Sequence, residues 1–159
     1  MYRTGIGFDV HRLVSDRPLK IGGVTITHSK GLLGHSDADV LVHSIIDAII
    51  GALALGDIGL HFPDTDSQYF NADSLEMLSH IHLLASKKGF VCENLDSIII
   101  AQKPKMSPHI FEMRKNLAEV LKIEIDQVSV KATTTERLGL IGREEGIGAQ
   151  AIVLYKSTN

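Results

Sequence analysis

A largely apolar run at residues 95–102, with three consecutive isoleucines, is the feature that most limits how this chain can fold. It has the length and the β-branched side chains of a buried strand. Helical patterns lie on both sides of it. One runs from about residue 73 to residue 88, with basic residues in its last turn and Gly89 after it. The other is opened by Ser107-Pro108, with Ser107 as the cap, and reaches about Leu121.

The other segments complete an α+β pattern. Strands are expected at residues 5–11, 128–133 and 147–155, and a hairpin with a Gly-Gly turn at residues 19–26. A helix capped by Ser36 or Asp37 would run to about Leu55 and end at Gly56, and residues 60–71 indicate a loop. We expect a two-layer α+β sandwich: a mixed four-stranded sheet with helices on one face plus a small β-hairpin, in a single domain over residues 1–159.

Composition excludes several classes of protein. Apolar residues make up 44% and charged residues 22%, which is ordinary globular usage and excludes disordered and fibrous chains. The longest apolar candidate is interrupted by Asp47 and Asp57, so we expect no membrane span. The N-terminus shows no signal-peptide pattern, and the single cysteine, Cys92, excludes an internal disulfide. We expect a bacterial cytoplasmic protein, although a processed plastid protein would show the same features.

Charge is unevenly distributed along the chain. All 16 Lys and Arg residues lie outside residues 31–86. That segment holds eight acids: Asp37, Asp39, Asp47, Asp57, Asp64, Asp66, Asp73 and Glu76. An acidic, histidine-containing segment suits a cation and a basic remainder suits an anion, but two oppositely charged surfaces without ligands explain the pattern equally well. A net charge of −3 lacks the basic excess of a nucleic-acid binder, so no nucleic-acid partner is expected.

Asp9, His11 and His43 are candidate metal ligands. Asp9 and His11 are two residues apart on an expected strand and so point to the same face. With His43 they would give the three ligands of a catalytic zinc site with an open position. The alternative is a polar pair that faces water at the end of a strand. Asp39 and Asp47 lie four residues on either side of His43, so they either support it as a ligand or only stabilise the helix.

Candidate anion-binding groups lie in three places. Ser36 precedes the expected helix and either caps it or contacts a phosphate. Residues 103–107 form a basic turn, which either presents backbone groups to a ligand or is simply solvated. Residues 131–136 place three threonines before Glu136, a pattern that suits phosphate and a magnesium ion held by one carboxylate. A threonine-rich strand closed by a charged turn is the alternative interpretation of this last segment.

Taken together and in order, these segments resemble one family. They are Gly7-Phe8-Asp9-Val10-His11, residues 31–39 with His43, residues 55–59 and 61–66, Ala101-Gln102-Lys103-Pro104-Lys105-Met106, residues 131–136, and Gly142-Arg143. They span the chain nearly from end to end, and their conjunction is specific although each is modest alone. The chain is similar to the 2-C-methyl-D-erythritol 2,4-cyclodiphosphate synthase family of the non-mevalonate isoprenoid pathway.

The resemblance implies a phosphorus–oxygen lyase. Its substrate would be 4-diphosphocytidyl-2-C-methyl-D-erythritol 2-phosphate, whose 2-phosphate attacks the β-phosphorus and releases CMP, leaving the cyclic diphosphate. Phosphoryl transfer of this kind needs in-line positioning and charge neutralisation more than a protein nucleophile. Two other functions stay open on the residues alone. A metal-dependent phosphohydrolase would place water in line, and a binding module for nucleotide diphosphates would not turn substrate over.

The resemblance also assigns roles to residues. Asp9, His11 and His43 would bind zinc, and Glu136 would bind magnesium or manganese. His35 and Thr134 would stabilise the transition state. The substrate would be bound by Asp9, Val10, His11, His35, Ser36, Asp57, Ile58, Gly59, Phe62, Pro63, Asp64, Thr65, Asp66, Ala101, Gln102, Lys103, Pro104, Lys105, Met106, Ser107, Ala132, Thr133, Thr134, Thr135, Glu136 and Arg143.

The resemblance finally implies partners. The chain would form a homotrimer with active sites between subunits, and a cavity on the threefold axis, near Arg143, would hold an isoprenoid diphosphate. Leu140 and Gln150 depart from the family pattern there, where an aromatic residue and a glutamate are frequent. Other enzymes of the pathway would associate with the chain weakly and without a covalent link.

Overall fold

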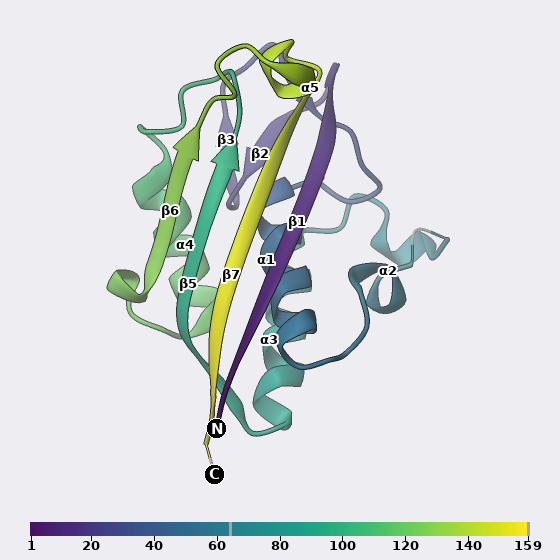
Figure 1. The fold of residues 1–159 in the computed structure, drawn as a ribbon. Helices are drawn as coiled ribbons and strands as arrows, with labels where there is room; N and C mark the ends of the chain where they lie inside the picture. The colour runs from purple at the N-terminus through teal and green to yellow at the C-terminus, as the bar shows by residue number, and fades with distance from the viewer. Residues whose placement is uncertain (64, 159) are drawn as a thin grey trace.

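The computed structural model describes residues 1–63 and 65–158. The elements follow the order shown in Figure 1: β1 Tyr2–Ser15, β2 Leu19–Ile21, β3 Val24–Ile26, β4 Lys30–Leu32, α1 Val40–Ala52, α2 Ile58–His61, η1 Ser67–Tyr69, α3 Ser74–Lys87, β5 Phe90–Ile100, α4 Ile110–Leu121, η2 Ile125–Gln127, β6 Val128–Thr133, α5 Gly139–Gly142 and β7 Gly146–Ser157. In the described part of the chain, every helix is too short or too polar to cross a bilayer.

The main sheet has five strands in the order β4-β1-β7-β5-β6. The β5–β6 pair is parallel and the other pairs are antiparallel, which confirms a mixed sheet. The expected count of four was wrong because β4 was missed. Its three residues are too few to show a period, and it exists through pairing with β1, where Leu13 lies opposite Leu32. The β2–β3 hairpin is confirmed, with Gly22 and Gly23 at positive φ in its turn.

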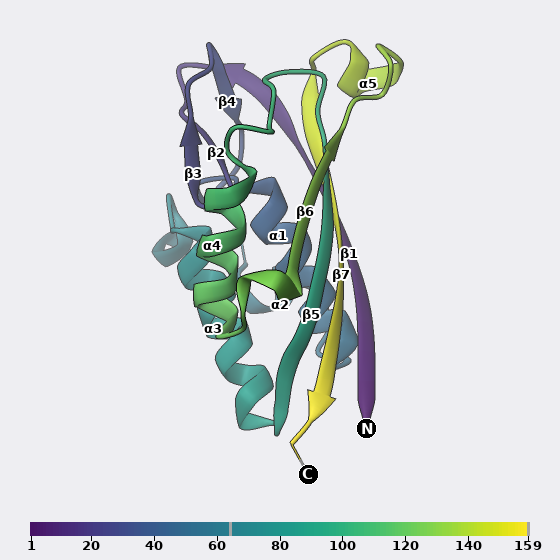
Figure 2. The same cartoon turned by 90° about the vertical axis from the view of Figure 1, so that its left-hand side faces the viewer.

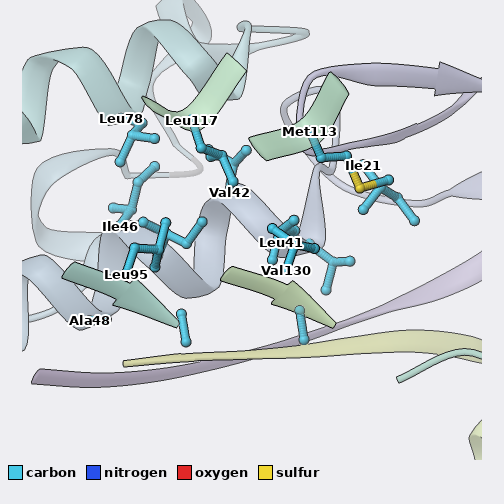
Figure 3. Close-up of a cluster of buried hydrophobic side chains, with 14 of the residues drawn as sticks. Ile21, Leu41, Val42, Ile46, Ala48, Leu78, Leu95, Met113, Leu117 and Val130 are labelled. Atoms are coloured by element: carbon cyan, nitrogen blue, oxygen red, sulfur yellow. The ribbon is translucent and has the colours of Figure 1, made fainter. Parts of the chain in front are cut away.

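Helices α1, α3 and α4 cover one face of the sheet, and Figure 2 shows the other face bare. The two-layer arrangement is therefore confirmed. Figure 3 shows how the core fills the space between the layers: Ile46 of α1 and Leu78 of α3 lie above Leu95 of β5. All three side chains are fully buried. Burial of this continuous apolar layer is the main force that holds α1 against β1.

Two expected helix starts were wrong. Helix α1 is capped by Asp39, whose carboxylate accepts from the Val42 amide, so neither Ser36 nor Asp37 is its cap. Helix α4 begins after His109 without a side-chain cap, so Ser107 has no capping role. The expected start of α3 near residue 73 is confirmed, and Asp73 caps this helix by accepting from the Leu75 amide. The expected loop at residues 60–71 contains the end of α2 and all of η1.

Glycines let α1 approach β1 closely. A Cβ atom at Gly7 would lie 2.0 Å from the Ser44 carbonyl oxygen, and one at Gly5 would lie 1.9 Å from that of Ala48. No side chain fits at such distances, so only glycine is compatible with this packing. The close approach brings His43 of α1 within reach of the next two helix-facing residues of β1, Asp9 and His11.

Candidate metal centre and active site

The three candidate metal ligands meet where β1 crosses α1. The Oδ2 atom of Asp9 lies 2.8 Å from Nε2 of His11 and 3.2 Å from Nδ1 of His43. The two ring nitrogens are 3.1 Å apart. The alternation of β1 places Asp9 and His11 on its helix-facing side, as predicted from their spacing. One carboxylate oxygen and two imidazole nitrogens thus face a common point.

Backbone groups orient two of these side chains. The other carboxylate oxygen of Asp9, Oδ1, accepts from the Val10 amide at 2.8 Å. Nδ1 of His11 lies 2.6 Å from the carbonyl oxygen of Leu33, which can only accept. That ring nitrogen therefore carries a proton, and Nε2 of His11, which faces Asp9 and His43, is the nitrogen that can bind a metal ion.

The charges of the triad are coupled. Burial alone would raise the pKa of Asp9, but hydrogen bonds from His11 and His43 outweigh it and hold the pKa well below its usual range. Burial alone would lower the pKa of His11, but the hydrogen bond and the charge of Asp9 raise it. A bound cation would take the place of the proton that His11 shares with Asp9.

The donor set fits a divalent metal ion. In the described chain, this is the one group of three or more His, Cys, Asp or Glu residues with ligand atoms close enough to share an ion. The ligands of a tetrahedral zinc ion, at about 2.0–2.2 Å from it, lie about 3.3–3.6 Å from one another. The triad atoms, 2.8–3.2 Å apart, reach that spacing with small side-chain movements. Three protein ligands leave a fourth position open to a ligand oxygen.

The triad lies in a cavity of about 310 Å³. Besides the triad, its lining comprises Gly34, His35, Ser36, Ile58, Gly59, Phe62, Tyr69 and Met77. The structure thus brings together expected site residues from β1, α1, the loop before α1 and helix α2. Val10 lies between two ligands, but its side chain is on the opposite face of the sheet, so only its backbone faces the triad.

Of the two interpretations of Asp39 and Asp47, support of His43 is contradicted by their partners, and Asp39 stabilises the helix as its cap. The carboxylate of Asp39 is fully buried and accepts from the amides of Gly22 and Gly23 in the hairpin turn. Burial raises its pKa to about 6, against the effect of these hydrogen bonds. Asp47 accepts from the backbone of Ile58 instead. These residues hold the hairpin and α2 against α1, and His43 has other partners.

Nε2 of His43 lies between two serine hydroxyls, 3.1 Å from Oγ of Ser36 and 3.0 Å from Oγ of Ser74. Ser36 also accepts from the Ala38 amide, so this serine contacts both the loop backbone and the ligand. Ser74 is the first residue of α3 and lies 31 positions from His43 in sequence. The sequence offered no signal for it, because helical or strand spacing cannot connect residues on separate elements.

The loop around α2 forms one wall of the cavity. Asp57 caps α2 by accepting from the Leu60 amide, and Phe62 is buried against Tyr69 with ring centroids 5.2 Å apart. His35 lies 3.4 Å from the Asp66 carbonyl oxygen. Pro63 is half-buried and Thr65 is exposed, while Asp64 lies outside the described residues. Tyr69 and Met77 also line the cavity and were not among the expected site residues.

A second cluster of expected site residues lies at the ends of β5 and β6. The Ala101 amide donates to the Thr133 carbonyl oxygen, and Gln102 accepts from the Arg137 amide. Thr134 donates to the carboxylate of the exposed Glu136 at 3.1 Å. The remaining members are the buried Met106, half-buried Pro104 and Thr135, and the exposed residues Lys103, Lys105, Ser107, Ala132 and Arg143.

The two clusters are separate within one chain. Strand β7 lies between β1 and β5 in the sheet, so the ends of β5 and β6 lie on the far side of β7 from the triad (Figure 1). Across residues 1–63 and 65–158, no hydrogen bond or ion pair joins residues 101–107 or 132–136 to the cavity. The single chain therefore brings together the expected metal side of the site, but not the expected nucleotide side.

Comparison with known proteins connects this arrangement to one family. The model of the YgbB family matches residues 2–156. A curated relative from Bacillus licheniformis is 60% identical over 98% of this chain and 99% of its own length, and is named 2-C-methyl-D-erythritol 2,4-cyclodiphosphate synthase.

Two solved structures share the fold. The bifunctional IspDF from Campylobacter jejuni has a TM-score of 0.95 and 44% identity, with 99% of this chain matching 42% of that longer one. IspF from Plasmodium falciparum, solved as a CDP complex, has a TM-score of 0.87 and 38% identity over 99% of this chain and 97% of its own. The chain therefore belongs to the YgbB family and is an enzyme of the type for which its close relatives are named, the 2-C-methyl-D-erythritol 2,4-cyclodiphosphate synthases.

Proposed function

We propose that this chain converts 4-diphosphocytidyl-2-C-methyl-D-erythritol 2-phosphate to 2-C-methyl-D-erythritol 2,4-cyclodiphosphate and CMP. The observation that carries the proposal is the triad of Asp9, His11 and His43, which opens into a cavity in a chain of this family. Residues 1–159 would form one cyclodiphosphate synthase domain. A bacterial cytoplasmic location stays a prediction.

In the proposed reaction, an oxygen of the 2-phosphate forms a bond to the β-phosphorus. The bond from the β-phosphorus to the bridging oxygen breaks, and its electron pair leaves with CMP. The attacking phosphate is already an anion, so no side chain needs to remove a proton. This agrees with a cavity lined by hydrogen-bonding and apolar groups, in which no hydroxyl or thiol nucleophile is needed.

Zinc would be held by Asp9, His11 and His43, and magnesium or manganese by Glu136. Two such cations, when bound, neutralise the charge that the diphosphate gathers in the transition state. His35 and Ser36 border the triad and would donate to phosphate oxygens. Thr134 would stabilise the transition state from the second cluster. Phe62, packed against Tyr69, supplies an apolar wall of the same cavity.

The remaining expected contacts divide between the two clusters. Asp57, Ile58 and Gly59, with residues 62–66, would bind the erythritol part, since Ile58 and Gly59 line the cavity. Residues 101–107 and 132–135 would bind the cytidine part. The CDP complex of the Plasmodium falciparum relative supports a cytidine nucleotide as the ligand of such a site.

We infer that the complete site forms between subunits of a homotrimer. A substrate that contacts both clusters needs them closer together than one chain places them. The uncovered face of the sheet supplies an apolar surface for association, with Ile6 60%, Phe8 58% and Ile152 49% exposed. Arg143 and Leu140 are both exposed, and an isoprenoid diphosphate near Arg143 would be a further ligand of the trimer. Other enzymes of the pathway would bind the assembly weakly.

Phosphorus NMR on the purified protein with this substrate, zinc and magnesium tests the proposed reaction. We expect CMP together with a cyclic diphosphate. CMP with an open-chain product would mean that water attacks, and the chain would be a phosphohydrolase. If a sample shown to contain zinc gives no reaction, the chain would instead be a binding module that does not turn the substrate over.

Two histidine variants supply the matched comparison. His43→Ala removes a ligand, so we expect it to lose both zinc and turnover while keeping its fold. His28→Ala changes a histidine outside the cavity and should retain both properties. Normal zinc content and turnover in His43→Ala would contradict the proposed site.

A further inference from the structure

The tautomer of His43 decides whether it can bind a metal through the nitrogen that faces Asp9. A neutral imidazole carries one proton, on Nδ1 or on Nε2. Nδ1 is the atom that faces Asp9 and His11, so it offers a lone pair only when the proton is on Nε2. Two hydroxyls, those of Ser36 and Ser74, lie within hydrogen-bond distance of Nε2. Without a metal ion, the Asp9 carboxylate, 3.2 Å from Nδ1, accepts a hydrogen bond from that nitrogen. When a metal ion displaces the Nδ1 proton, the remaining ring proton must stay on Nε2, so the direction of the hydrogen bonds at Nε2 matters for metal binding.

The hydroxyl of Ser74 donates its hydrogen bond to Asp37 and not to His43. Its Oγ donates to Oδ1 of Asp37, and the Ser74 amide donates to Oδ2 of the same carboxylate at 3.2 Å. An ionised carboxylate accepts hydrogen bonds and donates none. The single hydroxyl proton of Ser74 thus points at Asp37, and its oxygen presents lone pairs to Nε2 of His43, 3.0 Å away.

A lysine keeps Asp37 in this role. Nζ of Lys20, on β2, lies 2.8 Å from Oδ2 of Asp37 and 3.0 Å from Oδ2 of Asp73. Asp73 in turn caps α3, the helix that begins with Ser74. One cation from the hairpin therefore stabilises the charge of Asp37 and helps to anchor the helix end that carries the hydroxyl.

Ser36 lacks such a constraint. Its oxygen accepts from the Ala38 amide at 3.2 Å, and the direction of its own proton is free. If Ser36 donated to Nε2 of His43, the ring proton would move to Nδ1 and the metal would lose a ligand. Only at Ser74 is the direction of the hydrogen bond to the ring fixed, because Asp37 accepts the hydroxyl proton.

We propose that Ser74 and Asp37 are positioning residues that hold the ring proton of His43 on Nε2 when a metal ion is bound, so that Nδ1 presents a lone pair to the metal. This inference rests on the proposed function, in which His43 is a zinc ligand. Neither residue contacts the metal. Their effect on metal affinity comes through the ring of His43.

Long-range proton–nitrogen NMR of ¹⁵N-histidine-labelled, zinc-loaded protein detects the Nε2 proton of His43 and the rate at which it exchanges with water. We expect a slowly exchanging Nε2 proton in the unmodified chain. Ser74→Ala and Asp37→Asn should each make this proton exchange faster. The first removes the acceptor, and the second introduces an amide that can donate to Ser74 and reverse the direction of the hydrogen bonds. Ser74→Thr keeps the hydroxyl and should restore slow exchange, and Ser36→Ala should leave the exchange rate unchanged.

Zinc affinity, measured by competition with a chromophoric chelator, provides the second readout. We expect a loss of about 10–100-fold for Ser74→Ala, which is typical when a hydrogen-bond partner of a metal ligand is removed. Ser74→Thr should lie close to the unmodified chain. If Ser74→Ala does not fold, Asp37→Asn carries the same test.

Unchanged proton exchange and unchanged zinc affinity in both Ser74→Ala and Asp37→Asn would overturn the proposal. So would exchange that becomes faster in Ser36→Ala but not in Ser74→Ala, because Ser36 would then be the acceptor. Neither NMR nor zinc affinity involves substrate. A chain that shows the expected exchange and zinc affinity but forms no cyclic product would therefore contradict the proposed reaction and leave the positioning role standing.

Discussion

The three candidate metal ligands differ in what fixes their orientation. Asp9 and His11 are held by backbone groups, the Val10 amide and the Leu33 carbonyl. Such backbone partners persist when a side chain is replaced, except where proline removes an amide proton. His43 is held by side chains on two other segments, so its orientation alone can be changed from a second site. At the scale of single residues, the ring of His43 is therefore the adjustable part of the centre.

Glu136→Gln tests the expected magnesium ligand. Glu136 is exposed and accepts from Thr134, and it is not a member of the zinc triad. The amide keeps the size of the side chain but loses its charge. We therefore expect normal zinc content and a several-fold higher magnesium concentration at half-maximal rate. The rate as a function of magnesium concentration, at saturating zinc, measures this.

Glu119→Gln makes the same chemical change on the exposed face of α4 and serves as the control. It should show the magnesium dependence of the unmodified chain. An identical magnesium dependence in Glu136→Gln would remove Glu136 from the site.

His82 should make the fold sensitive to acid. It is buried in α3 with its Nδ1 atom 3.3 Å from the Tyr155 hydroxyl. Burial, and secondarily the charge of Lys122, lower its pKa below the ordinary 6.5. Below pH 6.5 the unfolded chain then binds a proton that the folded chain does not, so stability falls as pH decreases through this range.

His82→Gln removes this titration. We expect the free energy of unfolding to fall less steeply below pH 6.5, by at most about 1.4 kcal/mol per pH unit for one proton. Denaturant titrations between pH 5 and 7 of both zinc-free proteins give the two slopes. The other histidines are common to both, so their difference isolates His82. Equal slopes, or a steeper one in the variant, would contradict the assignment.

At the scale of elements, the contact of α1 with β1 brings the ligands together, and glycine makes that contact possible. Gly7→Ala would place a Cβ atom 2.0 Å from the Ser44 carbonyl oxygen. The helix must then move away from the strand, at a cost of about 1–3 kcal/mol or more for overpacking. The same movement separates His43 from Asp9. We expect denaturant unfolding to show lower stability and chelator competition to show weaker zinc binding.

Gly51→Ala provides the comparison within the same helix. Gly51 is exposed in α1, and the nearest atom to an added Cβ is the Ile6 carbonyl oxygen at 3.8 Å. Alanine fits there and favours the helix by about 0.5–1 kcal/mol, so stability should rise slightly. If Gly7→Ala were as stable as Gly51→Ala, the close approach of α1 to β1 would not require glycine at position 7.

Local rules predicted the elements whose signals lie within their own sequence. Asp73 and Gly89 mark the ends of α3, and alternation places Asp9 and His11 on one face of β1. The local rules failed where contact with a distant segment determines the structure. Strand β4 exists only through pairing with β1. The carboxylate of Asp39, which caps α1, also accepts from the hairpin turn 16 to 17 residues earlier.

The candidate site shows the same contrast between local signals and contacts with distant segments. Residues that share one strand or one segment could be identified from spacing or from family resemblance. The partners of His43 could not, because Ser74 approaches from a helix 31 residues later and Lys20 approaches Asp37 from the hairpin. Such contacts depend on how the layers pack, which no periodicity in the sequence encodes.

At the scale of the whole molecule, the sheet has one covered face and one exposed face. Tyr2, Ile6, Phe8 and Val10 alternate along the exposed face of β1, and Ile6 lies opposite Ile152 of β7. A contiguous apolar face of this kind is typical of an association surface. With the second cluster at the ends of β5 and β6, association through this face would supply each cavity with the nucleotide-binding residues of a neighbour.

Subunit complementation tests whether the active site is shared. His43→Ala should inactivate the metal side of the site, and Glu136→Ala the other side. When the two variants are co-expressed in equal amounts and assemble at random, one site in three of each mixed trimer, or about one quarter of all sites, would combine an intact metal side with an intact neighbouring side. We therefore expect about one quarter of normal activity per site from two inactive proteins, with light scattering at about three times the chain mass of 17.3 kDa.

A second mixture of variants distinguishes an active site shared between subunits from association of subunits alone. His11→Ala and His43→Ala both damage the metal side, so no site in their mixed trimers is complete and no activity should return. If the first pair also stayed inactive although the mixed trimers formed, each chain would hold a whole site, and the nucleotide would have to bind beside the triad. A light-scattering mass of one chain would contradict the proposed trimer. Recovery in the first mixture alone requires that residues on opposite sides of β7 act on one substrate through neighbouring chains.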